Sequence, residues 1–165
     1  STLDRSSAAS DVYKRQIKDL AALFKDFKLH SSINEASTLH IYRQFIPIRV
    51  GEDEDPEAYV PPEPYIQVKL ADGELNDRDE RQTANVVLMI GVCDHDPNRQ
   101  VYSDALNIVE MIKLHYGANG VFGKSFEVET PIRWAISDED THPYYYAAVG
   151  FSVSAPAIYR EGVET

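Results

Sequence analysis

The sequence has one cysteine, no long hydrophobic run and no excess of positive charge, and each shortage excludes a class of protein. Its 165 residues offer only Cys93 for a disulfide, so an intramolecular disulfide is excluded. Cys93 ends a short apolar run, so we expect a buried, unreactive thiol, as in a protein of a reducing compartment. No apolar run approaches the roughly 20 residues of a membrane-spanning helix, so no membrane partner is expected.

Motifs of the well-known chemistries are also missing. There is no glycine-rich phosphate loop, no Gly-x-Ser-x-Gly turn, no His-Glu-x-x-His motif and no cysteine pair. The best candidate for a metal site is Asp94-His95-Asp96, but adjacent residues of an extended strand point to opposite faces. Asp96 is also a plausible helix cap, so turn and cap chemistry is the preferred interpretation. We therefore predict no catalytic residue, no cofactor and no metal ligand.

The negative charge is concentrated in one segment. Residues 51–80 contain eleven acids and two bases, so 2 − 11 = −9 of the net charge of −11 lies there. One interpretation is a pair of solvated acidic loops that keep the protein soluble by self-repulsion. The other is that the acids line a passage through which DNA moves without sticking, because acids repel phosphate. The residues concerned are Glu52, Asp53, Glu54, Asp55, Asp77, Asp79 and Glu80.

Residues 1–16 differ in character from the rest. The run Ser6-Ser7-Ala8-Ala9-Ser10-Asp11-Val12-Tyr13-Lys14-Arg15-Gln16 resembles the translation of a transposase sequencing adapter. We expect residues 1–16 to be a non-native segment or a disordered arm. The length of the remaining chain, residues 17–165, predicts a single domain with a two-layer core.

Hydrophobic spacing predicts two helices. The first begins near Ile17, and its residues at helical spacing are Ile17, Leu20, Ala21, Phe24 and Phe27. The second has Asp96 as N-cap, Pro97 at its first position and Gly117 as its stop. Its core stripe consists of Ala105, Ile108, Val109, Ile112 and Tyr116.

Five segments have strand patterns. They are residues 39–50, 65–70, 86–93, 126–136 and 144–155. Pro47 places the first at a sheet edge or a bulge, whereas the unbroken apolar run 86–93 predicts a strand covered on both faces. Trp134 is expected in the core. The fold class is therefore α+β, with a mixed, mostly antiparallel sheet and two helices packed on one face.

Three consecutive tyrosines, Tyr144-Tyr145-Tyr146, open the last strand. Large aromatics on both faces of a strand explain them without any function, because strands favour such residues. Stacking on nucleic-acid bases is disfavoured by the acidic charge. An interface is the functional alternative, since tyrosine is enriched there, so Tyr144 and Tyr146 are candidate subunit contacts.

An ordered set of segments resembles one protein family. In chain order the segments are an amphipathic helix, an acidic proline-rich loop, Pro64-Tyr65-Ile66-Gln67-Val68, a second acidic loop, Val86-Val87-Leu88-Met89-Ile90-Gly91-Val92, Asp94-His95-Asp96-Pro97, the helix with Tyr102-Ser103-Asp104-Ala105-Leu106-Asn107-Ile108-Val109-Glu110, Pro131-Ile132-Arg133-Trp134 and His142-Pro143-Tyr144-Tyr145-Tyr146. From about residue 17 to 161, the chain resembles the tail terminator (tail completion) proteins of long-tailed bacteriophages.

The resemblance implies assembly and not catalysis. Such proteins form a ring, usually a hexamer, that caps the tail tube, ends its polymerisation and offers a joining surface to the head-completion protein. The implied partners are further copies of the chain, the tail tube protein and the head-completion protein, and DNA passes through without specific binding. The implied location is the head-proximal end of the tail in the virion, after assembly in the host cytoplasm.

Three other interpretations of the function stay open. The first is another ring of the head–tail connector, such as a head-closure or adaptor protein. The second is a small metal-dependent hydrolase that uses Asp94, His95 and Asp96. The third is a monomeric host protein with a binding role.

Overall fold

Each of the two helices in the described residues is followed along the chain by three strands. The computed structural model describes residues 2–27, 39–45, 64–75, 81–93, 100–123 and 126–155. In chain order these residues form α1 (Thr2–Leu23), β1 (His40–Arg43), β2 (Tyr65–Glu74), β3 (Gln82–Cys93), α2 (Gln100–Ala118), β4 (Val121–Phe122), β5 (Phe126–Ile136) and β6 (Tyr144–Ala155). None of the helices in these ranges is long and apolar enough to span a membrane.

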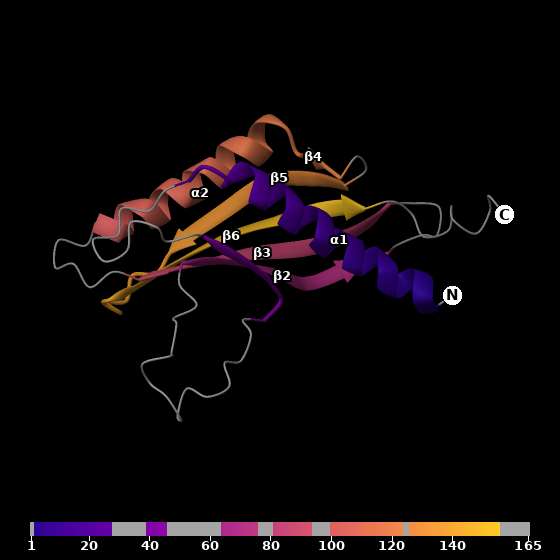
Figure 1. The fold of residues 1–165 in the computed structure, drawn as a ribbon. Coiled ribbons are helices and arrows are strands. Elements are labelled where there is room, and N and C mark those ends of the chain that lie inside the picture. Colours follow the sequence, from indigo (N-terminus) through magenta and orange to yellow (C-terminus); the bar gives the residue numbers. More distant parts are fainter. Residues whose placement is uncertain are drawn as a thin grey trace, which may run out of the picture.

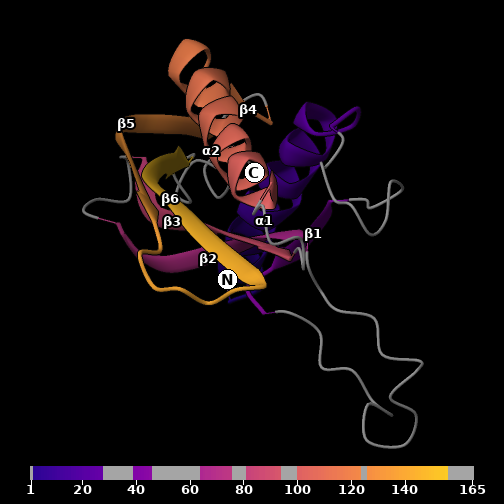
Figure 2. The same ribbon diagram turned by 90° about the vertical axis from the view of Figure 1, so that its left-hand side faces the viewer.

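All six strands belong to one sheet, in the order β1-β2-β3-β6-β5-β4. Only β1 and β2 run parallel, and the other neighbours are antiparallel. Both helices lie over the same face of the sheet (Figure 1), and the view turned by 90° shows them side by side (Figure 2). The predicted α+β class, with a mixed, mostly antiparallel sheet and two helices on one face, is confirmed.

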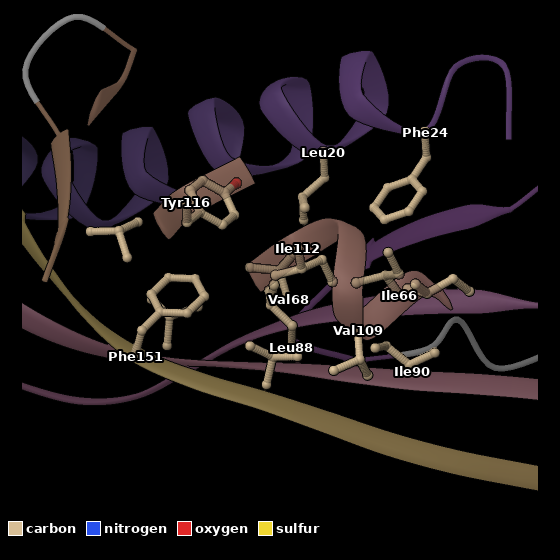
Figure 3. Packing of buried hydrophobic residues seen from close by; sticks show 14 of the residues in the cluster. Leu20, Phe24, Ile66, Val68, Leu88, Ile90, Val109, Ile112, Tyr116 and Phe151 are labelled. Atoms are coloured by element: carbon tan, nitrogen blue, oxygen red, sulfur yellow. The ribbon is translucent and has the colours of Figure 1, made fainter. Parts of the chain in front are cut away.

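The core lies between the two helices and the central strands. Alternate residues of β3 point toward the helices, and Leu88 and Ile90 are fully buried. Leu20 and Phe24 reach down from α1 toward Ile66 of β2 (Figure 3). The predicted stripe of α2 is confirmed, since all of its members are buried: Ala105, Ile108, Val109, Ile112 and Tyr116. Each large apolar side chain in this cluster contributes roughly 1.5–3 kcal/mol by leaving water.

The expectation that β3 is covered on both faces is wrong for the described residues. Val87 and Met89 are only half-buried, because both helices lie on the other face. Cys93 is likewise half-buried, and not fully buried as predicted. Tyr65 covers part of this second face: its ring lies across Gly91, where an added Cβ would come within 2.5 Å of two ring carbons.

Helix α1 is longer than the sequence predicted. It begins at Thr2 and not near Ile17, and Val12 and Gln16 of the first sixteen residues are buried. The buried positions of α1 and of the residue that follows it therefore recur every four residues, at Val12, Gln16, Leu20 and Phe24. Ala21, which the spacing placed toward the core, is exposed. A non-native origin of residues 1–16 stays a prediction.

Strand β1 ends earlier than predicted because the chain turns at Gln44. This residue has a φ of 57°, a left-handed conformation that no β-strand can contain. The Gln44 side chain stabilises the turn: its Oε1 accepts hydrogen bonds from the backbone N–H of Leu70, at 3.1 Å, and from the hydroxyl of Tyr13. The predicted edge position of this strand is confirmed. Pro47 and the rest of 46–50 lie outside the described residues.

Other element boundaries moved by a few residues. Strand β2 continues to Glu74, so Asp72 and Glu74 belong to a strand and not to the second acidic loop. Helix α2 ends at Ala118, one residue beyond the predicted stop at Gly117. The short strand β4 was not predicted, and the helix caps Asp96 and Pro97 lie outside the described residues.

Trp134 is not a core residue. Its partner across the sheet is the fully buried Val149, so Trp134 does face the helices as the alternation predicted. Half of its surface is nevertheless exposed (50%). The reason is its position: β4 pairs with only the first two residues of β5, and no other strand of the described residues pairs with the rest of that edge.

Candidate subunit interface

The two edges of the sheet differ in structure and in chemistry. One edge is β1, a four-residue strand that runs parallel to its neighbour and lies beside α1. The other is the part of β5 beyond β4, an antiparallel strand beside α2. Unpaired strand edges present backbone groups and side chains that can bind another chain. A head-to-tail contact requires two different surfaces on one subunit, and these two edges differ.

A groove lies at the first edge, between α1 and β1. Its volume is about 550 Å³, and its walls are Lys14, Ile17, Lys18, Ile41, Tyr42, Arg43 and Phe45. We call it the α1–β1 groove. The apolar residues give it a partly hydrophobic surface, and Phe45 is the most exposed of them, with 75% of its surface in solvent.

The charged side chains that the described residues place on the walls of the α1–β1 groove are all positive. They are Lys14, Lys18 and Arg43, and none of the described wall residues is an acid. All three are exposed. Lys18 and Arg43 lie outside the segment 1–16, so the positive charge of the groove does not depend on that segment. A hollow with apolar walls and cations can bind an acidic peptide.

The wall formed by α1 is held in place by polar contacts with α2. The buried Gln16 donates a hydrogen bond from Nε2 to the hydroxyl of Tyr116, and Asp19 Oδ2 lies 2.9 Å from Nε2 of His115. Burial raises the pKa of Tyr116, and the neighbouring carboxylate of Asp19 raises it further, so the phenol stays neutral. Gln16 Oε1 is buried without a hydrogen-bond partner.

The second edge carries an exposed aromatic residue and an irregular backbone. Lys113 of α2 places its Nζ 5.2 Å from the centroid of the Trp134 ring, a cation–π geometry. Glu129 pairs with Ser152 and Arg133 with Gly150, so four residue steps of β5 lie opposite two of β6. This bulge precedes Trp134 and interrupts the ladder of hydrogen bonds.

The predicted interface residues Tyr144 and Tyr146 lie at the start of β6. They pair with Cys93 and Gly91 of β3, whereas the pairing of β5 with β6 ends at Ile136 and Ala147. They are half-buried and point to the face opposite the helices, as the alternation predicted. A contact through their side chains would therefore involve this face.

The predicted acidic residues Glu52, Asp53, Glu54, Asp55, Asp77, Asp79 and Glu80 lie outside the described residues. Two further acids of the same segment, Asp72 and Glu74, are exposed on β2. Asp72 accepts a hydrogen bond of 2.6 Å from the side chain of Asn85.

The candidate metal residues Asp94, His95 and Asp96 also lie outside the described residues. Within the described ranges, no three side chains of histidine, cysteine, aspartate or glutamate are grouped so that they could hold a metal ion. Of the other histidines, His40 stacks with Tyr42 and His142 lies 2.9 Å from the hydroxyl of Tyr145. These contacts are those of surface side chains.

Sequence reasoning did not identify the α1–β1 groove. Its walls come from two segments that only the tertiary fold brings together, and the turn at Gln44 that exposes Phe45 has no glycine or proline to indicate it. No protein-family model and no curated protein sequence matches the chain.

Proposed function

We propose that this protein is a structural component of a phage virion. It forms a ring that caps the tail tube, ends tube polymerisation and provides the surface to which the head is joined. The observation that carries the proposal is the pair of unlike open edges, the α1–β1 groove on one side and the Trp134 edge on the other.

Unlike edges favour a ring for a geometric reason. When one surface of a subunit binds a different surface of the next, the growing chain of subunits keeps one free surface of each kind, at its two ends, until it closes into a ring. A ring that closes leaves no free edge. A sheet with an open strand on both sides would otherwise tend to add further chains without limit.

The ordered resemblance to tail terminator proteins supports the position of this ring at the end of a tail tube. The charge of the chain supports the same position, because DNA would cross the central hole of such a ring. A net charge of −11 disfavours binding of the phosphate backbone, so DNA can pass without being held.

The test is to mix the purified chain with assembling tail tube protein and to image the products. We expect rings of several subunits at one end of the tubes, and shorter tubes as the amount of this chain rises. Sedimentation or native mass measurement of the capped end gives the number of subunits. A chain that stays monomeric on the tube, or that leaves tube length unchanged, would contradict the proposal. A ring on the portal side alone would point to another connector protein.

A further inference from the structure

We propose that the α1–β1 groove of one subunit binds the acidic segment, residues 52–57, of a second copy of the same chain. The inference rests on the proposed ring, for which it supplies one contact between neighbours. The groove is one of the two surfaces of this contact, and the segment, which lies outside the described residues, is the other.

The distribution of charge along the chain points to this pairing. Residues 1–50 contain eight bases and five acids, a balance of 8 − 5 = +3. Residues 51–80 have a balance of −9, and residues 81–165 have 6 − 11 = −5. The groove therefore lies in the only part of the chain with a positive balance, and the most acidic part follows it directly. Opposite charges on one chain are complementary between two copies.

The apolar groups are complementary as well. The acidic residues are followed by Ala58-Tyr59-Val60, and the groove offers Ile17, Ile41 and the exposed Phe45 beside its cations. Prolines at positions 56, 61 and 62 reduce the backbone freedom of the unbound chain, so less entropy is lost when it binds. The segment thus offers both acids for the cations of the groove and apolar residues for its apolar walls.

The chain is long enough for the segment to reach a neighbour. Seven residue steps separate Phe45 from Glu52, and seven more separate Glu57 from Pro64. Seven extended steps span at most about 25 Å, roughly the width of a small domain. The two ends are fixed beside the edge of the sheet: Phe45 lines the groove, and Pro64 O accepts a hydrogen bond of 3.0 Å from His40 N.

Cross-linking between different chains tests the inference. On a Cys93→Ser background, one chain carries Ala21→Cys, on the exposed surface of α1 one turn beyond Lys18, and another carries Ala58→Cys. These positions leave every cation and acid of the contact in place. When the two chains are mixed and mildly oxidised, we expect a disulfide-linked pair. Ala135→Cys, on the opposite sheet edge, is the matched control for Ala21→Cys and should give at least tenfold less of the linked pair.

A charge test accompanies the cross-link. Lys18→Glu should reduce the yield of the linked pair about tenfold, whereas Lys25→Glu, the same change at an exposed position outside the groove, should leave it within about twofold. When the chain that supplies the acidic segment carries both Glu54→Lys and Asp55→Lys, the yield of the linked pair with the Lys18→Glu chain should be restored.

The outcomes separate the inference from the proposed ring. Rings without a cross-link between chains would overturn this contact and leave the ring standing. A cross-link formed only inside a chain that carries both cysteines would overturn it too. A cross-linked pair that never closes into a ring would support the contact and contradict the ring.

Discussion

At the scale of single residues, two glycines show how the environment decides the role of the same residue. Gly91 of β3 lies under the ring of Tyr65, and no side chain fits there. Gly117, near the end of α2, has no atom within 4 Å of the position where a Cβ would be. The first glycine is required by close packing, while the second only weakens a helix.

Substitution of these glycines by alanine should therefore have opposite effects. Gly91→Ala forces the Tyr65 ring aside and should lower the free energy of unfolding by about 1–3 kcal/mol. Gly117→Ala should raise it by up to about 1 kcal/mol, because alanine favours the helix. Urea unfolding of both variants measures the two changes. Equal effects would show that Tyr65 does not cover Gly91.

The raised pKa of Tyr116 predicts how the free energy of unfolding depends on pH under alkaline conditions. Its pKa is raised in the folded state by burial and by Asp19, so the unfolded state loses the phenolic proton first, from about pH 10 upward. Stability from this group is complete below about pH 10 and falls above it, with a slope of at most about 1.4 kcal/mol per pH unit.

Tyr116→Phe tests this dependence, since phenylalanine has no proton to lose. Between about pH 10 and pH 11, the free energy of unfolding of the variant should fall less steeply with pH than that of the parent chain. Urea unfolding at each pH measures both. At pH 7 it should be less stable by about 1–2 kcal/mol, because Gln16 Nε2 loses its acceptor. An unchanged alkaline slope would mean that Tyr116 is not buried beside Asp19.

At the scale of elements, the sequence predicted best where one period repeats over many residues. The stripe of α2 and the alternation of β6 are confirmed, because each face meets a uniform environment. The prediction failed where tertiary neighbours decide burial. Trp134 follows the alternation and is still half-exposed, since β4 stops before reaching it.

The partial exposure of Trp134 predicts that removal of its side chain has a small effect on stability. Trp134→Ala should lower the free energy of unfolding by only about 1 kcal/mol, because half of the ring already contacts water. Leu88→Ala, at a fully buried position of β3, should cost about 2–5 kcal/mol. Chemical denaturation compares the two. A loss at Trp134 as large as that at Leu88 would place the ring in a buried core after all.

The candidate site was predictable only in part. The acidic segment is visible in the sequence because its charges are consecutive. The α1–β1 groove was not visible, because its cations Lys18 and Arg43 are distant in sequence and each is unremarkable alone. Charge that is local in sequence can be read directly, whereas charge that is assembled by folding cannot.

At the scale of the whole molecule, two electrostatic effects of different range act on assembly. Subunits with a net charge of −11 repel each other over long distances, whereas the groove and the acidic segment would attract over a few ångströms. Salt screens the long-range effect first. The Debye length falls from about 30 Å at 0.01 M salt to about 10 Å at 0.1 M and about 3 Å at 1 M.

Self-association should therefore pass through a maximum as salt is added. We expect assembly to strengthen between about 0.01 and 0.1 M salt, as repulsion is screened, and to weaken toward 1 M, as the close contact is screened. Sedimentation velocity at constant protein concentration measures both limbs. Assembly that rises steadily to 1 M salt would mean that apolar groups alone hold the subunits together.

The bulge in β5 limits how another chain can pair with this edge of the sheet. Between Glu129 and Arg133 the register of β5 against β6 shifts. A straight strand of another chain therefore cannot pair with this edge through a regular ladder of backbone hydrogen bonds. In the proposed ring, a neighbour at this edge would therefore be recognised through side chains such as Trp134 and not through a continuous ladder of backbone hydrogen bonds.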